Sequence, residues 1–442
     1  MARNFPPDFL WGAAASAYQT EGATETDGRG PSVWDTYAKV PGNIVNGDTA
    51  DISCDHYHRY PEDVALMRGL GVKAFRLSTA WPRIFPEGKG QVNQLGVDFY
   101  DRLIDLMLHE GIEPWICLHH WDMPVPIEEA GGWRSRETAK IFGDYAAEVI
   151  RRFGDRVKRF APINEPNVIP WVAYNLGRHA PGKQNYDACL QAIHNLNLAH
   201  GKTVSAVRAE APDAEIGNIV SLGPVRPHYD DAAHEEARVF GDCMWRRVMV
   251  DPLWLGTYPD PIAEKIEPLI KPGDMEEISQ KLDFFGLNHY NPVFVAPNPN
   301  ATLGYSEVMP PSGMGPLTDV NWLVDPDAFL EQIRDTSNRY GKPVIYITEN
   351  GASYPDMLRS DRTVIDNDRI RYFDRYLGAL LDAIDEGHDV RGYFAWSLMD
   401  NFEWGRGYSK RFGLVYVDYP TLQRIPKASY HWLKGVIEDN AL

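Results

Sequence analysis

The sequence predicts a fold of the α/β class, a single (β/α)8 (TIM) barrel with its active site at the C-terminal ends of the strands. Eight short apolar runs alternate along the chain with longer segments of helical period. Alternating strands and helices favour a parallel sheet, and eight such units favour a closed barrel. A doubly wound open sheet is the alternative, but no glycine-rich phosphate loop follows the first run. We therefore expect one barrel domain over residues 1–442.

The expected strands are runs dominated by β-branched, aromatic and other apolar residues. In chain order they are residues 9–15, 74–79, 113–119, 159–164, 215–221, 283–288, 343–349 and 390–397. Between them, apolar residues recur at helical spacing, which predicts amphipathic helices. The clearest are residues 96–110, 135–153, 188–209, 327–340 and 366–386. Residues 296–321 are rich in proline, glycine and asparagine, so we expect a long irregular loop there, over the barrel mouth.

Composition narrows the class of protein and the kinds of partner. Of the 442 residues 44% are hydrophobic and 24% charged, which is typical of a globular protein rather than a disordered one. The net charge of -18 disfavours nucleic acid and anionic membrane surfaces as partners. No apolar stretch is long enough to span a membrane, and the first residues lead directly into an expected strand. With four scattered cysteines, which we expect to be reduced, we predict a cytoplasmic location.

Two glutamates stand at the ends of apolar, strand-like runs. Glu165 follows residues 159–164, and Glu349 ends residues 343–349. An acidic residue at the end of a buried strand is costly unless it is used, and the C-terminal ends of strands hold the active site of a barrel. Paired carboxylates are the machinery of glycoside hydrolysis. We therefore predict that these two residues form a catalytic pair.

Other expected strands also end in polar or aromatic residues. Taken singly, each has a structural interpretation as a capped or satisfied polar group. Together, at one end of one barrel, they predict a polar, aromatic and carboxylate-rich pocket. They are Gln19, Glu21, Arg76, His119, His120, Trp121, Asn164, Asn288, His289, Tyr290, Asn350, Trp396, Asn401, Glu403 and Trp404. The thirteen tryptophans fit either a large core or a sugar site, because flat rings cover the apolar faces of pyranoses.

The chain resembles the β-glycosidases of glycoside hydrolase family 1. The resemblance covers nearly the whole length, from the Phe-Leu-Trp-Gly-Ala-Ala of residues 9–14 to residues 412–418. Four specific motifs carry it. They are Asp-His-Tyr-His-Arg-Tyr at 55–60, Asn-Glu-Pro at 164–166, Ile-Thr-Glu-Asn-Gly at 347–351 and Asp-Asn-Phe-Glu-Trp at 400–404.

The resemblance implies a retaining double displacement. Glu165 matches the acid/base and Glu349 the nucleophile, which would lie ~5–5.5 Å apart. Glu165 must be protonated before attack, and we expect the negative charge of Glu349 to raise its pKa. Esterification of Glu349 removes that charge, so Glu165 then acts as base. The implied mechanism needs no metal and no cofactor.

Further roles follow from the same matching. Arg76, Asn288 and Tyr290 match residues that support the nucleophile. Residues matching the substrate-binding positions are Gln19, His120, Trp121, Asn164, Trp322, Trp396, Glu403 and Trp404. Trp396 matches the platform under the sugar ring and Trp322 the wall on the leaving-group side.

The implied substrate is a terminal β-D-glucosyl residue of a neutral β-glucoside, a small molecule. We also expect side activity on β-galactosides and β-fucosides, as well as transglycosylation. A carboxylate at Glu403, beside the sugar O6, would repel a 6-phosphate, although Lys410 nearby leaves the phosphorylated alternative open. The natural leaving group and the oligomeric state are left open.

Four residues depart from the family pattern, namely Pro162, Asn167, His289 and Asn321. Pro162 is unusual because proline cannot donate a hydrogen bond within a central strand. We expect these departures to affect the leaving-group side rather than the reaction.

Three alternatives remain. Residues 54–58 and 119–120 could hold a metal, although a structural role is favoured for them. The barrel could be a carbohydrate-binding module that has lost catalysis. The enzyme could also use a sugar or alcohol, rather than water, as its natural acceptor.

Overall fold

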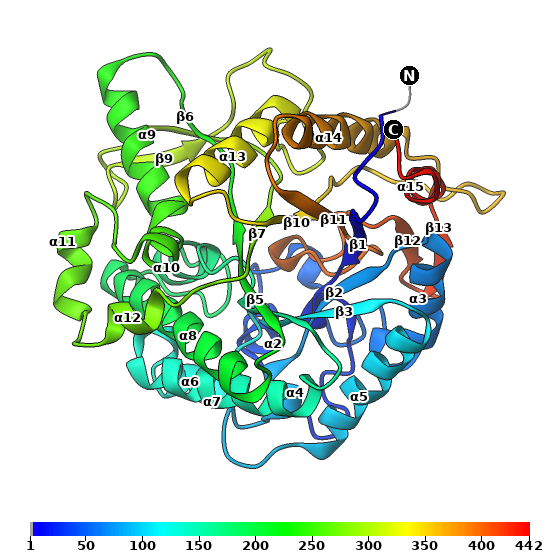
Figure 1. Ribbon diagram of the computed structural model, residues 1–442, viewed down its shortest axis with the longest axis horizontal. Helices are drawn as coiled ribbons and strands as arrows, with labels where there is room; N and C mark the ends of the chain where they lie inside the picture. The colour runs from blue at the N-terminus through cyan, green and yellow to red at the C-terminus, as the bar shows by residue number, and fades with distance from the viewer. Residues whose placement is uncertain (1–2) are drawn as a thin grey trace.

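The computed structural model describes residues 3–442 and contains a closed barrel of eight parallel strands, which confirms the predicted (β/α)8 fold (Figure 1). Around the barrel the strand order is β1-β11-β10-β7-β5-β4-β3-β2. The barrel strands are β1 (Leu10–Ala14), β2 (Ala74–Ser78), β3 (Glu113–His119), β4 (Arg159–Ile163), β5 (Glu215–Ser221), β7 (Phe284–Asn288), β10 (Ile345–Asn350) and β11 (Val390–Trp396). Each expected strand is present, with ends that differ by at most two residues.

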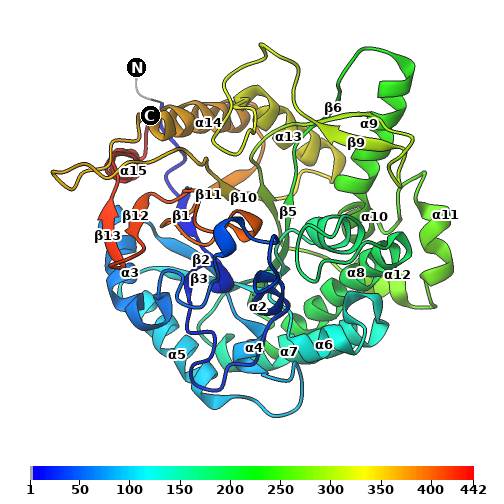
Figure 2. The same ribbon diagram turned by 180° about the vertical axis from the view of Figure 1, so that it is seen from behind.

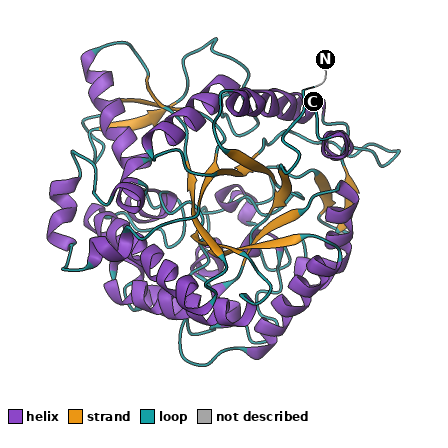
Figure 3. Ribbon diagram, in the orientation of Figure 1, coloured by secondary structure: helices purple, strands orange, loops and turns teal. Residues whose placement is uncertain are grey.

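Helices form a ring around the strands (Figure 3). The five predicted helices are present as α5, α7, α8, α13 and α14. The helices are α1 (Ala17–Thr20), α2 (Val33–Ala38), α3 (His56–Leu70), α4 (Trp81–Ile84), α5 (Gln94–His109), α6 (Val125–Glu129), α7 (Arg136–Phe153), α8 (Tyr186–Glu210), α9 (Ala232–Trp245), α10 (Asp251–Leu255), α11 (Ala263–Ile266), α12 (Asp274–Ile278), α13 (Pro326–Arg339), α14 (Asn367–Asp385) and α15 (Ala428–Asp439). Within residues 3–442, no helix combines the length and the apolar character needed to cross a membrane.

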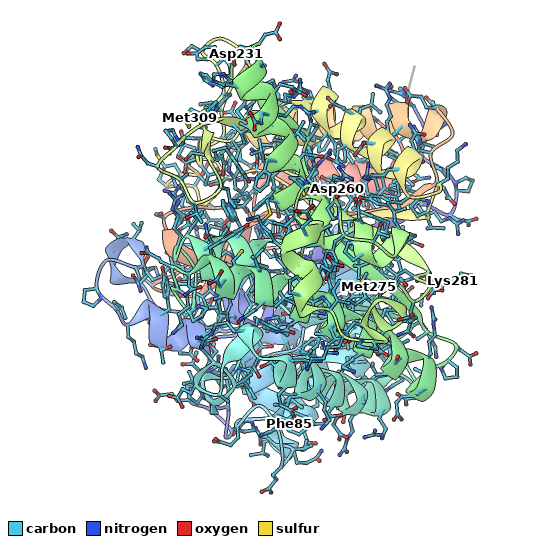
Figure 4. The ribbon with its side chains drawn as sticks, turned by 90° about the vertical axis from the view of Figure 1, so that its left-hand side faces the viewer. Phe85, Asp231, Asp260, Met275, Lys281 and Met309 are labelled. Carbon is cyan, nitrogen blue, oxygen red and sulfur yellow. The ribbon has the colours of Figure 1, made fainter. Side chains whose placement is uncertain are left out.

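The segment predicted to be a long irregular loop, residues 296–321, is more ordered than its composition indicated. It contains β9 (Tyr305–Val308), which pairs antiparallel with β8 (Val293–Pro297). With β6 (Val225–Pro227) these strands form a small sheet beside α9 (Figure 2). In Figure 4, α9 begins after Asp231, at the top of the view, and runs down beside the segment that carries Met309. Valine and tyrosine contacts within this small sheet stabilise it, although prolines and glycines dominate the surrounding sequence.

Pro162 lies in β4, a central strand, at a place where the ladder to β5 is interrupted. Register pairing between β4 and β5 covers Arg159 and Phe160, and contact resumes only at the isolated bridge from Asn164 to Ile219. Proline has no backbone N–H, and it therefore stands at a position where β4 is not paired with β5.

Large aromatic rings fill the N-terminal half of the barrel. The Trp115 ring centroid lies 4.8 Å from those of Tyr346 and Phe394 and 5.3 Å from that of Phe284. A Cβ on Gly12 would lie 2.4 Å from the Phe394 ring, so glycine is needed there for the ring to fit. The floor of the barrel is thus a packed core.

A second strand pair, β12 (Val415–Asp418) and β13 (Gln423–Pro426), leads into α15. The C-terminus returns to the N-terminus, where Arg3 N donates to Leu442 O at 2.9 Å. The two ends of the described chain therefore lie side by side (Figure 1).

We expect Phe394→Ala to lower the free energy of unfolding by about 3–5 kcal/mol, because it leaves a cavity inside the barrel. Leu95→Ala, on an exposed face of α5, serves as the control and should change it by less than about 0.5 kcal/mol. Urea denaturation of both variants measures the difference. Equal effects would contradict the assignment of the barrel interior as the main core.

Candidate active site

A pocket of about 860 Å³ opens at the C-terminal ends of the barrel strands. Most of the residues predicted from the sequence line it. They are His120, Trp121, Asn164, Glu165, Tyr290, Trp322, Glu349, Trp396, Glu403 and Trp404. Arg76 and Asn288 are also at this end, buried beneath the pocket floor. Parallel strands that all point the same way bring these distant residues together.

Three pocket residues have left-handed backbone conformations that side chains other than glycine rarely adopt. Glu165 has φ 46°, Trp121 φ 77° and Trp404 φ 46°. Each such residue costs on the order of 1–3 kcal/mol, and such costs cluster at functional sites. Directly after β4, the Glu165 amide donates to Ile219 O of β5 at 2.9 Å, which fixes this turn. The strained turn directs the Glu165 side chain into the pocket.

Glu349 is held on both carboxylate oxygens. Arg76, from β2, forms a buried ion pair with Oε1. The Tyr290 hydroxyl donates to Oε2 at 2.5 Å. Glu349 is 3% exposed and Arg76 is 1% exposed, so water screens this pair little. The contacts fix the carboxylate in one orientation and favour its charged form.

Amide side chains connect the two glutamates. Asn288 Nδ2 donates to Glu165 Oε1 at 2.8 Å and to Asn164 Oδ1 at 3.2 Å. Arg76 Nη1 donates to the same Asn164 oxygen at 3.0 Å, while its other terminal nitrogen binds Glu349. Asn288 and Glu349 are also register partners of neighbouring strands β7 and β10. One hydrogen-bond network therefore positions both carboxylates, and their separation of ~5–5.5 Å stays a prediction.

The two carboxyl groups have different electrostatic surroundings. Burial, followed by the charge of Glu349, raises the pKa of Glu165 to about 8. The sequence argument named the Glu349 charge as the source of this shift, but burial is the larger cause. Burial also raises the pKa of Glu349, while Arg76 and Tyr290 oppose that rise. Since the cation contacts Glu349, a single proton shared by the pair resides on Glu165.

Aromatic side chains form the side wall of the pocket. The ring of His120 is stacked with that of Trp396 at 5.9 Å and with that of Trp404 at 5.8 Å. Its Nε2 lies 3.1 Å from Asn164 Nδ2, so Nε2 is the acceptor. Burial is the main reason that the pKa of His120 lies well below its usual range, so this ring is neutral. The Trp121 indole donates to Asn164 O at 2.8 Å and positions the chain before Glu165.

Gln19 is buried and is not among the residues that line the pocket. Its role in binding substrate stays a prediction. Its Nε2 donates to Asn401 Oδ1 at 3.0 Å and to Phe402 O at 2.9 Å, while its Oε1 accepts from Ser16. The amide is thus engaged in holding the segment that precedes Glu403.

Two of the departures from the family pattern turn away from the pocket. Asn167 Nδ2 donates to Ser221 O at 2.9 Å, and His289 Nδ1 donates to Leu222 O at 2.8 Å. Neither residue lines the pocket. Asn321, with φ 64°, precedes Trp322 in a left-handed turn that asparagine tolerates. These departures therefore act on the backbone around the pocket.

The outer wall contains residues that the sequence analysis missed. Val172, Arg178, Trp245 and Glu307 all line the pocket. They come from the helical segment Ile169–Asn175, from the loop after it, from the end of α9 and from β9, where no strand-end signal marks a site. Their signal is their position above the barrel mouth, which exists only in the folded structure with the small sheet in place.

Two of the histidines considered as metal ligands lie against carboxylates. His56 Nδ1 lies 2.8 Å from Asp63 Oδ2, and His58 Nδ1 lies 2.6 Å from Asp55 Oδ1. Across the described part of the chain, no group of three or more His, Cys, Asp or Glu side chains has the arrangement of a metal site. Lys410, considered for phosphate binding, is paired with Asp319 at 2.9 Å.

The chain matches Glycosyl hydrolase family 1 over residues 1–442. The chain belongs to this family. Beta-glucosidase A of Thermotoga maritima is 40% identical over 451 residues, covering 100% of this chain and 99% of that protein. A bifunctional beta-D-glucosidase/beta-D-fucosidase of Bifidobacterium breve is 42% identical, covering 100% of both.

Solved structures of family 1 members agree with the fold. A family 1 b-glucosidase from Thermotoga maritima superposes with a TM-score of 0.95 at 41% identity, covering 99% of each chain. A Thermotoga maritima family 1 glycoside hydrolase in complex with a cyclophellitol analogue transition state mimic superposes equally well, covering 100% of this chain and 99% of that one. The protein is therefore a glycoside hydrolase with a (β/α)8 barrel.

Burial of Glu165 predicts a pH-dependent loss of stability. Its folded-state pKa of about 8 exceeds the ordinary value of 4.5, so the folded state binds the proton more tightly. This contribution is complete below the ordinary value and is lost as pH rises through the folded-state value. In Glu165→Gln it is absent. We expect the melting temperature of the variant, relative to wild type, to rise steadily between about pH 5 and pH 8.5.

Glu25→Gln, at an exposed position, is the matched control and should leave the pH profile of melting unchanged. Differential scanning calorimetry across this pH range measures all three proteins. A constant offset between wild type and Glu165→Gln would show that Glu165 carries no raised pKa.

Proposed function

We propose that this glycoside hydrolase is a retaining β-glucosidase that removes the terminal non-reducing β-D-glucosyl residue of neutral β-glucosides. The observation that carries the proposal is the buried pair Glu165 and Glu349, joined by one amide network but differently surrounded. One carboxyl group keeps a proton and the other keeps its charge. Two carboxyl groups in these opposite states, facing one pocket, are what a retaining glycosidase needs. The names of the relatives, β-glucosidases, support the same substrate class.

In the first step Glu349 attacks the anomeric carbon and forms a glycosyl ester. Its lone pair makes the new C–O bond while the bond to the leaving oxygen breaks. Glu165 transfers its proton to that oxygen, so the leaving group departs as a neutral alcohol. Arg76 and Tyr290 hold the attacking carboxylate in place before the step.

In the second step water attacks the anomeric carbon and releases Glu349. Esterification has removed the neighbouring negative charge, so Glu165 is ionised and accepts a proton from this water. Two inversions at one carbon give net retention. An alcohol or a second sugar can replace water in this step, which accounts for the transglycosylation included in the proposal.

The pocket wall supports a neutral hexose as the glycone. His120 and Glu403 offer acceptors and donors for ring hydroxyls, and Trp396 offers an apolar face. Burial, then the charge of Glu349, raises the pKa of Glu403 to about 8. A sugar phosphate beside the buried carboxyl of Glu403 would be unfavourable, because the negative charge of Glu349 lies nearby. The relative with both β-glucosidase and β-fucosidase activity supports side activity on β-fucosides, and we include β-galactosides.

Cysteine burial supports the proposed cytoplasmic location. Cys54, Cys117, Cys189 and Cys243 are all unpaired and buried. Free thiols are typical of proteins in reducing compartments.

We expect Glu349→Ala to lower kcat on 4-nitrophenyl β-D-glucoside by on the order of 10⁴-fold or more, as when other catalytic nucleophiles are removed. Added azide should restore turnover by attacking the anomeric carbon directly. A single inversion would then give α-glucosyl azide. Nitrophenol release and NMR of the azide product are the measurements.

Glu165→Ala is the matched variant and should give the β-glucosyl azide, because Glu349 still forms the ester. The same azide anomer from both variants would contradict the assignment of roles. A folded wild type inert on all β-glycosides would contradict the proposed function itself.

A further inference from the structure

A buried network of six charged side chains lies behind the glycone wall of the pocket. It contains three cations and three carboxylates, so its formal charges balance. Its members, which we call the Asp400 network, are Asp356, Asp366, Arg369, Asp400, Arg411 and Lys427. Arg411 side-chain exposure is 17%, and the other side chains are at most 2% exposed. None of these residues lines the pocket, and the proposed mechanism uses none of them.

Asp400 is bound on both carboxylate oxygens. Lys427 Nζ donates to Oδ1 at 2.6 Å, and the Gly413 amide donates to the same oxygen at 3.0 Å. Arg411 Nη1 donates to Oδ2 at 2.6 Å. A Cβ at Gly413 would lie 2.0 Å from Asp400 N, so the two backbones are in direct contact. The contacts come from the segment between β11 and α15 and fix the backbone at Asp400.

The same network reaches the segment that follows Glu349. Arg369, from α14, is paired with Asp356 at 2.9 Å. It also donates to Ala352 O at 3.2 Å and to Arg411 O at 2.7 Å. Lys427 Nζ contacts Asp356 at 2.5 Å as well as Asp400. The segment that follows β10, just after Glu349, is thereby connected to the segment after β11 that carries Glu403.

Glu403 depends on its backbone for its position. Among residues 3–442, no side chain donates a hydrogen bond to its carboxylate, and its amide donates to Gly407 O at 2.8 Å. The neighbouring Trp404 holds a left-handed conformation. On the other side, Gln19 fixes Asn401 and Phe402. Asp400 and Gln19 are therefore two of the anchors of the segment that presents Glu403 to the pocket.

We propose that Asp400 is a positioning residue that sets glycone specificity by holding Glu403 and Trp404 beside the sugar hydroxymethyl group. The inference rests on the proposed β-glucosidase function. Removing the Asp400 charge leaves Lys427 and Arg411 buried with one carboxylate fewer. Because a buried cation that has lost its partner is unfavourable, the side chains and backbone around it rearrange. The segment from Asp400 to Trp404 then moves, while Glu165 and Glu349, held by their own network, stay in place.

The test compares two substrates that differ only at the sugar hydroxymethyl group, which the resemblance to family 1 places beside Glu403. 4-Nitrophenyl β-D-glucoside carries a hydroxymethyl group, and 4-nitrophenyl β-D-xyloside lacks it. In Asp400→Asn we expect the ratio of kcat/KM for glucoside over xyloside to fall by at least about tenfold, because an interaction with the hydroxymethyl group is lost. A general loss of folded enzyme lowers both values equally and leaves the ratio unchanged.

Asp251→Asn is the matched control. Asp251 is also buried, binding Arg247 at 3.1 Å and Arg339 at 2.9 Å, but Arg339 ends α13 just before β10 begins, at the opposite end of the barrel. Its ratio should equal that of wild type. If Asp400→Asn does not fold, Arg411→Gln removes one of the two cations that bind Asp400, and the same fall in ratio is expected.

An unchanged ratio in folded Asp400→Asn, or in Arg411→Gln where that variant replaces it, would overturn the inference. An equal fall in Asp251→Asn would also overturn it. If wild type is active on both substrates and the variants lose activity on both equally, this inference alone is overturned. Wild type without activity on β-glucosides would overturn the proposed function and this inference together.

Discussion

The ion pair between Arg76 and Glu349 is the interaction on which the site depends. Two carboxylates facing one buried pocket would both prefer to be protonated, because burial disfavours charge. A single guanidinium contacts one of them and leaves the other without a cation. That asymmetry divides one acidic pair into a nucleophile and an acid, and the rest of the pocket maintains it.

The barrel supplies the rigidity that the site requires. Arg76 comes from β2, Asn288 from β7 and Glu349 from β10, and the strand register fixes their relative heights. Below them, the packed rings around Trp115 fill the floor of the barrel. Strained backbone at Glu165 and Trp404 is sustained because the surrounding elements determine those turns. Behind the glycone wall, the Asp400 network connects the segments that follow β10 and β11.

Much of this site could be predicted from the sequence, because strand ends carry a clear signal. An apolar run that ends in a charged residue identified Glu165 and Glu349, and the same logic identified Asn288 and Trp396. Gln19 follows a strand as well, but its partners at Asn401 and Phe402 lie nearly four hundred residues away, so its burial had no local sign. β9 was missed because its pairing with β8 outweighs a composition typical of loops. The leading cause of the Glu165 pKa is burial, a property of the whole pocket that no short motif encodes.

The most direct test follows the charge of Glu165 through the reaction. Isotope-edited NMR of labelled glutamate, with Glu165→Gln for assignment, gives its pKa in the free enzyme and in the ester trapped with a 2-fluoroglucoside. We expect about 8 in the free enzyme. Loss of a charge ~5.5 Å away is worth about 3 kcal/mol at an effective dielectric constant near 20, or a fall of about two pH units. A pKa that is ordinary in the free enzyme, or that does not fall in the ester, would contradict the account.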